Sequence, residues 1–212
     1  KGTWRLTHIP TKKVLEERED SIIQVPYYTD RGTIINNGNE YTVISQSRLR
    51  PGVYTRKRKT GEIETQFNVR NGKGFRINID NDTGVFKLSA GQSHVPLYPI
   101  LKSIGVTDKD MIKAWGADIV AENAKKTDHQ ALKKVYERYA GYKADPLAND
   151  EVRGRFIKEA MANSEVDEDI IVRTMGLTGV KNVTPELILR ASQKMLNINR
   201  GEEQADNRDN PR

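Results

Sequence analysis

The order of apolar and polar residues divides the chain into two parts. Up to about residue 95, short apolar runs alternate with polar positions and are separated by turn residues, which is typical of antiparallel strands with one buried and one wet face. After Pro96 the apolar residues recur at helical spacing. We therefore predict an α+β fold, in which an antiparallel β-sheet built of hairpins is followed by a mainly helical module.

Turn residues at short intervals predict the hairpins. Asn36-Asn-Gly-Asn39 lies between the β-rich runs 31–35 and 41–45, and it supplies residues that tolerate the positive φ of a tight turn. Later turns are predicted at 59–61, 71–74 and 81–84, and they separate strands at 53–58, 62–69, 75–79 and 85–88.

Capping signals predict the helices. Thr107 and Asp110 have the spacing of a capping box, and Pro185 follows Thr184 as a first-turn proline. Breaks are predicted at Asp145-Pro146 and at 176–179. Helices are predicted at 96–104, 107–115, 129–142, 150–162, 167–175 and 184–196. The polar segment 199–212 is predicted to be a loop or a frayed end.

Composition excludes several kinds of site. The 212 residues include no cysteine, which rules out a disulfide scaffold, a thiolate zinc site and a cysteine nucleophile. Only His8, His94 and His129 are present, so a histidine-rich metal site is not expected. No apolar run approaches the ~20 residues of a membrane span, and no signal-peptide pattern is present. Because the first residue is Lys1, we expect the natural N-terminus to be missing or processed.

The positive charge is concentrated in the first part of the chain. The net charge is +6, with 35 basic and 29 acidic residues. Residues 1–88 hold sixteen basic and ten acidic residues, whereas 89–212 hold nineteen of each. A local basic surplus points to a polyanionic partner, and the alternative is an ordinary solvated surface.

Two arginine-containing segments are candidates for contact with phosphates. Arg48 and Arg50 precede a Pro-Gly turn, and guanidinium groups offer planar, bidentate donors. The alternative is a turn whose arginines point to water. The dense basic run consists of Arg56, Lys57, Arg58 and Lys59. It is suited to sequence-independent phosphate contacts, and the alternative is charged protection of an exposed hairpin edge.

No autonomous active site is visible in the sequence. Asn71-Gly-Lys-Gly74 is glycine-rich but does not open a helix, so we interpret it as a hairpin turn. Asp108 and Asp110 belong to a helix cap. The carboxylate pairs at 202/203 and 206/209 have the oxygen chemistry that Mg²⁺ prefers, but they lie in a segment with no sign of a pocket.

The order of motifs resembles the N-terminal half of the β subunit of multisubunit DNA-directed RNA polymerases. Residues 32–46 are similar to that family's "F-I-I-N-G-T-E-R-V-I-V-S-Q", and 48–54 to its "H-R-S-P-G-V-Y". Residues 74–79 correspond to "F-x-V-R-I-D", and 95–105 to "V-P-V-x-x-L-L-R-A-L-G" followed by "T-D-x-x-I" at 107–112. Residues 199–210 resemble "G-E-x-x-D-D-x-D-H-x-G-N".

This resemblance implies three segments. Residues 1–117 correspond to a protrusion-like β-rich domain with closing helices. Residues 118–186 correspond to a lobe that is reduced to a helical module, and 187–212 to a helix and polar tail that return to the body of the subunit. The reduced lobe and the divergent motifs favour a phage-encoded polymerase. The chain is also too short for a complete β subunit, which implies a truncated piece or one polypeptide of a split subunit.

The resemblance also implies the site and the partners. Ser45 and Gln46 match their motif directly and face the main channel, near the RNA–DNA hybrid and the rifamycin-type inhibitor site. Arg48 is displaced by one residue from the family's arginine, and Arg208 falls on the acidic tail motif, where the family's His is replaced by Asn210 or lost. The catalytic Mg²⁺ belongs to the β′-type partner, so this chain holds no cofactor.

We therefore predict a non-catalytic part of a nucleotidyltransferase, the DNA-dependent RNA polymerase. Its expected partners are the rest of β, the β′-type subunit, the DNA template and the nascent RNA, with no membrane. Its expected location is the cytoplasm, which is that of the bacterial host if the chain is phage-encoded; packaging into the virion stays open. Two alternatives remain: a stand-alone basic nucleic-acid-binding module, and a structural or assembly protein whose helices dock onto partners.

Overall fold

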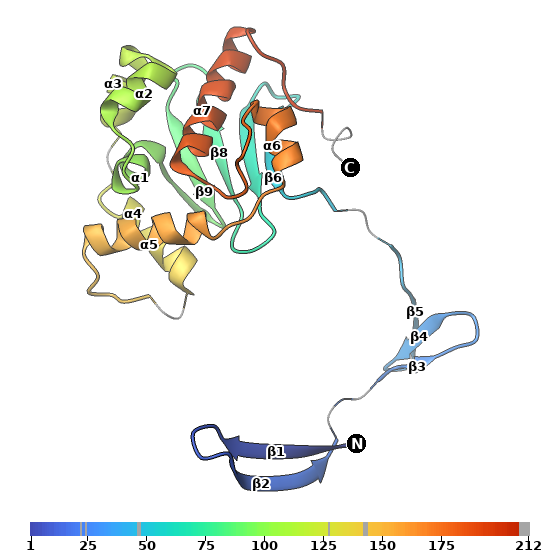
Figure 1. Cartoon of the computed structure of the whole chain (residues 1–212). Coiled ribbons are helices and arrows are strands. Elements are labelled where there is room, and N and C mark those ends of the chain that lie inside the picture. Colours follow the sequence, from blue (N-terminus) through green and yellow to red (C-terminus); the bar gives the residue numbers. More distant parts are fainter. Residues whose placement is uncertain (22, 24, 46–47, 127, 142–143, 208–212) are drawn as a thin grey trace. The chain divides into compact units, whose positions relative to one another are not determined.

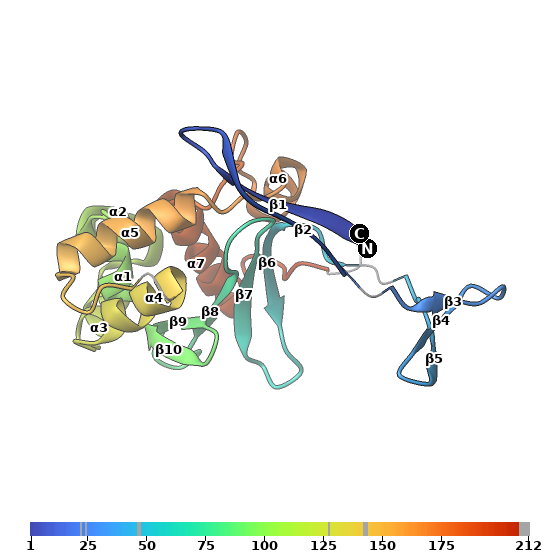
Figure 2. The same ribbon diagram turned by 90° about the horizontal axis from the view of Figure 1, so that it is seen from below.

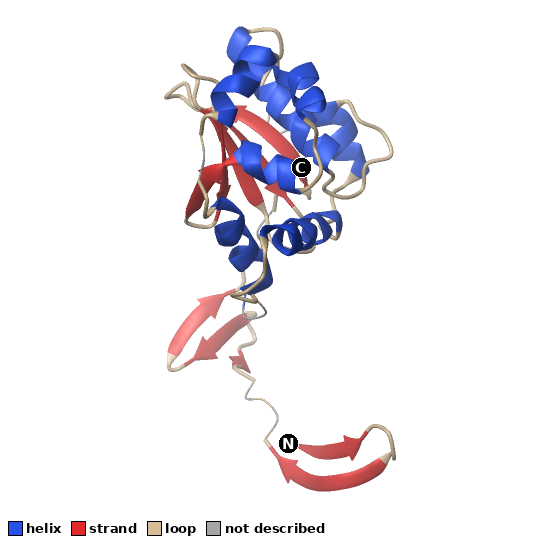
Figure 3. Ribbon diagram, turned by 90° about the vertical axis from the view of Figure 1, so that its left-hand side faces the viewer, coloured by secondary structure: helices blue, strands red, loops and turns tan. Residues whose placement is uncertain are grey.

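The computed structural model describes residues 1–21, 23, 25–45, 48–126, 128–141 and 144–207. It divides into two compact units, Lys1–Ser47 and Arg48–Arg212 (Figure 1). In the parts that the structure describes, the first unit is built of strands, and the helices lie in the second unit (Figure 3). The α+β fold predicted from the sequence is therefore confirmed.

The first unit contains two small antiparallel sheets. Strands β1 (Gly2–His8) and β2 (Lys13–Asp20) form a hairpin whose register shifts between Leu6 and Thr7. Strands β3 (Tyr27–Tyr28), β4 (Thr33–Asn36) and β5 (Asn39–Thr42) form a three-stranded sheet in that order. Asn37 and Gly38 have φ of 50° and 78° between β4 and β5, which confirms the predicted tight turn.

Few side chains of the first unit are buried. An isolated two-stranded hairpin is at best marginally stable, and a larger sheet needs a buried hydrophobic face or a helix packed against it. The exposed apolar side chains here include Trp4, Leu6, Ile9, Leu15, Val25, Tyr27, Tyr28, Tyr41, Val43 and Ile44.

The second unit is built on a five-stranded antiparallel sheet with the order β10-β9-β8-β7-β6. Its strands are β6 (Gly52–Lys57), β7 (Ile63–Asn68), β8 (Phe75–Ile79), β9 (Phe86–Ala90) and β10 (Ser93–Pro96). Consecutive strands are joined by hairpins, as the turn residues predict. Strand β10 was not predicted, because its four residues lie where the sequence changes from alternating to helical spacing.

Seven helices are described in the second unit, and Figure 2 shows α4 beside β10 and α6 beside β6. The helices are α1 (Leu97–Ser103), α2 (Asp108–Trp115), α3 (Ala117–Ala124), α4 (Ala131–Ala140), α5 (Asp150–Ala162), α6 (Glu168–Met175) and α7 (Pro185–Arg200). The Thr107–Asp110 capping box and the first-turn Pro185 are present as predicted.

Helix α3 was not predicted from the sequence. It begins directly after Gly116, whose φ is 93°. Its buried Asn123 donates from Nδ2 to the carbonyl of Gly84 (3.0 Å) and accepts from the amide of Phe86 (2.9 Å). A polar side chain thus fastens α3 to the start of β9, and this long-range contact has no local signal in the sequence.

One apolar core joins the sheet to the helices. Trp115 of α2 lies with its ring centroid 4.7 Å from that of Phe86 of β9, and its Nε1 donates to Oγ of Ser192 in α7 (2.8 Å). Helix α5 approaches α1 at Gly154, where an added Cβ would lie 2.7 Å from the carbonyl oxygen of Ser103. The predicted segment boundaries after 117 and 186 both fall inside this unit, whose observed limit is between 47 and 48.

Candidate nucleic-acid interface

The predicted basic run lies on the hairpin formed by β6 and β7. The register places Arg56 directly opposite Glu64. Arg56 donates from Nε to Oε1 of Glu64, and Arg58 donates from Nη2 to its Oε2 (2.7 Å). The Glu64 side chain is 1% exposed, so the two guanidinium groups cover and neutralise a buried carboxylate. Two of the four predicted phosphate-binding residues therefore hold the hairpin together.

The two lysines of the run have different surroundings. Lys57 and Lys59 are both exposed, and neither side chain forms a hydrogen bond or an ion pair with another residue that the structure describes. Phosphate contacts require charge without precise side-chain geometry. The charge that this hairpin offers to a polyanion therefore comes from the lysines.

Arg50 lies in an ion-paired cluster around Asp167. Arg50 donates from Nε to Oδ2 of Asp167 (3.1 Å), and Arg70 donates from Nη2 to its Oδ1. The amide of Asp167 also donates to the carbonyl of Pro51 (3.2 Å). Asp167 directly precedes α6, so this cluster joins the start of β6 to α6. The Arg50 side chain is still 46% exposed.

The other predicted site residues are divided between the two units and the segments outside the described residues. Arg48 is exposed. Ser45 is exposed and belongs to the first unit, whereas Arg48 and Arg50 belong to the second. Gln46 and Arg208 lie outside the described residues.

The polar face of the five-stranded sheet is not predicted from the sequence. Residues in register across antiparallel strands share a face, and the observed pairings place one set of polar side chains opposite the apolar core. The members of this face are Arg56, Glu64, Gln66, Arg76, Asn78, Lys87, Ser89 and His94. The alternation of apolar and polar positions up to about residue 95 is the available signal, but by itself it predicts only a wet face.

A hollow of about 650 Å³ lies over this face. We call it the polar basin. Its floor contains a short hydrogen-bond chain, in which Oγ of Ser89 donates to Oδ1 of Asn78 (3.0 Å) and lies 2.7 Å from Nδ1 of His94. The basic side chains that line the polar basin are Arg58, Arg76, Lys87 and Arg138, and the acidic ones are Glu62 and Glu64.

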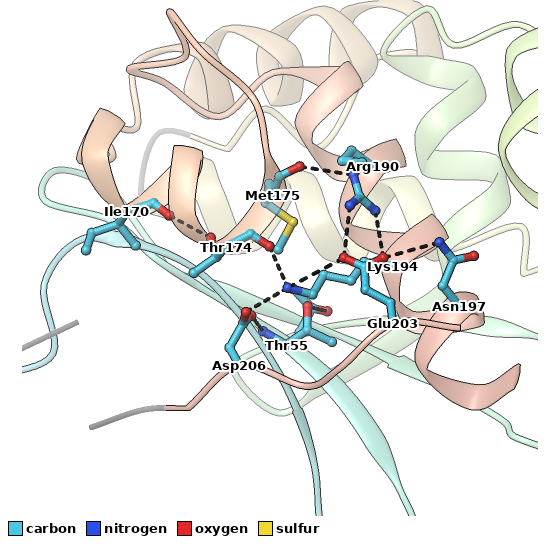
Figure 4. Close-up of polar contacts among 10 residues, drawn as sticks. Thr55, Ile170, Thr174, Met175, Arg190, Lys194, Asn197, Glu203 and Asp206 are labelled. Atoms are coloured by element: carbon cyan, nitrogen blue, oxygen red, sulfur yellow. Dashed lines mark hydrogen bonds and ion pairs between the residues drawn. The ribbon is translucent and has the colours of Figure 1, made fainter. Parts of the chain in front are cut away.

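A second polar cluster fastens the segment that follows α7 (Figure 4). Lys194 is 3% exposed, and its Nζ donates to Oδ1 of Asp206 (2.6 Å) and to the carbonyl of Thr174. Thr55 of β6 donates its amide to Oδ2 of Asp206 (2.7 Å) and accepts from the amide of Asp206 (2.7 Å). The segment around 206 therefore pairs with the edge of β6. The predicted loop is confirmed at 201–207, which form neither helix nor strand, but the contacts of Asp206 show that this part is not a frayed end.

Glu203 completes this cluster. Arg190 donates to Oε1 of Glu203 (3.0 Å), and Asn197 donates to its Oε2 (3.2 Å). Partial burial acts to raise the pKa of Glu203, but these hydrogen bonds together outweigh it and keep the pKa below its usual value. For Asp206 burial dominates and raises the pKa, although Lys194 and Thr55 act in the opposite direction. The carboxylates at 203 and 206 are thus committed to structural contacts.

Two classes of site are absent from the described residues. No group of three or more His, Asp or Glu side chains in the described ranges is arranged to hold a metal ion. No helix in the same ranges combines the length and apolar character that crossing a bilayer requires.

Comparison with known proteins places these features in a family. Residues 49–212 match the family model described as RNA polymerase Rpb2, domain 2. The chain is 31% identical over 125 residues to the DNA-directed RNA polymerase subunit beta of Thermotoga maritima, covering 58% of this chain and 10% of the relative. It is 30% identical over 119 residues to the subunit beta of Porphyromonas cangingivalis, covering 54% and 9%. The subunit beta of Bigelowiella natans is 25% identical over 119 residues, covering 54% and 11%. The chain thus aligns with about a tenth of the length of these curated relatives.

Proposed function

The chain belongs to the RNA polymerase Rpb2 domain 2 family, and from this premise we propose that it is a non-catalytic part of the β subunit of a DNA-dependent RNA polymerase. In this role it forms a wall of the main channel and contacts DNA or the RNA–DNA hybrid during transcription. The observation that carries the proposal is the family match, because it extends over the whole five-stranded sheet and all the described helices of the second unit.

The first unit supports a role inside a larger assembly. Its apolar side chains are largely exposed; those of Val43 and Ile44, for example, are 70% and 83% exposed. Exposed apolar surface of this kind marks an interaction site with another protein surface. We propose that the remainder of β and the β′-type subunit provide this surface.

In the proposed mechanism, the chain helps to position the nucleic acid and takes no part in the chemical step. The Mg²⁺ that supports phosphoryl transfer belongs, in this proposal, to the β′-type partner. The chain contributes cations beside the nucleic acid, and the exposed candidates are Arg48, Lys57 and Lys59. Arg50 is half-exposed and contributes from within its ion-paired cluster. Ser45, Gln46 and Arg208 stay in the proposed site on the strength of the resemblance.

A pull-down followed by a transcription assay tests the proposal. The full chain is affinity-tagged in its native host, and the recovered complex is supplied with ribonucleotides and a promoter-free DNA template. We expect a large β′-like polypeptide to co-purify and nucleotides to be incorporated. A stable monomer that binds RNA strongly and brings down no polymerase chain would overturn the proposal and favour a stand-alone binding module.

A further inference from the structure

We propose that the polar basin binds the backbone phosphates of a nucleic-acid strand through Arg76, Lys87 and Arg138. The choice of a nucleic acid as the ligand rests on the proposed function. The basin itself is defined by the sheet register, by the charges on its lining and by its shape. It is distinct from the hairpin lysines and from the cluster around Asp167.

The charge balance inside the polar basin favours an anion. Its acidic residues Glu62 and Glu64 are already paired, both with Arg58 and the latter also with Arg56. In contrast, Arg76, Lys87 and Arg138 form no ion pair with any residue in the described part of the chain. Lys87 also acts electrostatically on Asp80 just beyond the end of β8. Three cations without ion pairs therefore line one hollow.

Strand register sets the positions of two of these cations. Arg76 of β8 pairs with Ser89 of β9, and Asn78 of β8 pairs with Lys87 of β9. Arg76 and Lys87 are thus diagonal neighbours on one face, at a Cα spacing of roughly 7–8 Å. Long side chains at this spacing are able to contact neighbouring phosphates of an extended strand.

The third cation comes from a helix. Arg138 lies on α4 and packs against Gly91 in the turn between β9 and β10, where an added Cβ would lie 3.3 Å from Cζ of Arg138. The φ of Gly91 is 67°, which the turn requires. Its lack of a Cβ also leaves room for the guanidinium of Arg138. The helix thereby adds a cation at the rim of a surface otherwise formed by strands.

The floor of the polar basin is suited to a polar ligand. Asn78, Ser89 and His94 are linked by hydrogen bonds. The alternative is that these residues form an ordinary solvated face of the sheet. Such a face does not require a hollow of about 650 Å³ or an arginine from a helix at its rim. The concave shape places charges around the ligand instead of beside it.

Anisotropy of a labelled single-stranded DNA, measured with the full chain over a series of salt concentrations, tests the inference. The variant R76Q/K87Q/R138Q is compared with K109Q/K113Q/K158Q, which removes the same charge from exposed positions on α2 and α5. We expect ~10-fold weaker binding for the basin variant, and a salt slope smaller by about 2 at ~0.7 per lost contact. The control variant should change the affinity by less than about 2-fold, because distant exposed charges are screened.

The outcomes separate this inference from the proposed function. Equal affinities of the two triple variants, or no binding by the wild-type chain at low salt, would overturn the inference whatever the pull-down shows. Selective loss of binding in the basin variant, together with no co-purifying polymerase, would support the inference and remove the proposed function. If the triple variant fails to fold by circular dichroism, Lys87→Gln alone provides the same comparison with Lys109→Gln, with an expected ~2-fold weakening.

Discussion

The Nζ atom of Lys194 lies 2.6 Å from Oδ1 of Asp206, and this ion pair fastens the segment after α7 to the edge of β6. The two side chains are 4% and 11% exposed. Thr55 on β6 donates to the same carboxylate. The pair therefore holds the segment around 206 against β6, one of the two edge strands of the sheet.

We predict that Lys194→Met destabilises the chain by about 3–5 kcal/mol, because it leaves a carboxylate buried without its cation. The free energy of unfolding from urea titrations checks this value. Lys125→Met is the matched control, since its ion pair with Glu122 is exposed and is worth about 0–1 kcal/mol. An effect of Lys194→Met no larger than that of the control would contradict the structural role of the pair.

The two kinds of basic residue on the β6–β7 hairpin should behave differently. Replacing Lys57 and Lys59 by Gln removes two exposed cations, so we predict a salt slope of nucleic-acid binding lower by about 1–2 and no loss of stability. Arg58→Gln uncovers the buried Glu64 and should lower the free energy of unfolding by about 1–3 kcal/mol. Salt-dependent anisotropy and urea titration measure the two effects. The assignment of roles fails if the lysine variant is the one that unfolds more easily.

Arg50 and Asp167 provide a test of whether Arg50 acts on nucleic acid or only on the fold. Arg50→Ala and Asp167→Asn both break the 3.1 Å ion pair, but only the first removes a cation. We predict that Arg50→Ala slows transcript elongation by the purified complex, whereas Asp167→Asn leaves it near the wild-type rate. Equal elongation defects in the two variants would show that Arg50 matters only for packing.

The cap of α2 predicts a dependence of stability on pH. Hydrogen bonds from the side chain and the backbone of Thr107 hold the pKa of Asp110 below its usual value. A carboxyl with a depressed folded-state pKa contributes stability that is fully present above the unfolded pKa of ~4 and is lost as the pH falls through the lower folded value. We expect the Tm to drop below about pH 4, and Asp110→Asn to flatten this drop. Glu159→Gln, an exposed substitution on α5, is the control, and an identical flattening by both variants would count against the cap as the cause.

Local signals were sufficient for much of the fold. The turn at Asn37 and Gly38, the capping box at Thr107 and Asp110, and the proline at 185 are all present as predicted. Each of these features depends on residues within a few positions of one another. The resemblance to the β subunit of RNA polymerase is likewise confirmed by the family match.

Long-range contacts account for what the sequence did not predict. Thr55 and Asp206 are 151 positions apart, and Arg50 and Asp167 are 117 apart, so no local pattern indicates that they pair. The pairing of Arg56 with Glu64, which partly neutralises the basic run, is in contrast predictable from the sequence. A hairpin with its turn at 59–61 places Arg56 opposite Glu64, and counting across the turn would have found the pair.

Site-specific photocrosslinking in a halted transcription complex tests the central claim most directly. A photoreactive residue is placed at position 59, 87 or 109 of the full chain, and the complex is assembled with labelled DNA and RNA. We predict that positions 59 and 87, on the hairpin and in the polar basin, crosslink to nucleic acid, whereas 109 on α2 does not. An active complex in which 59 and 87 label no more strongly than 109 would contradict the claim that this chain lines the nucleic-acid channel.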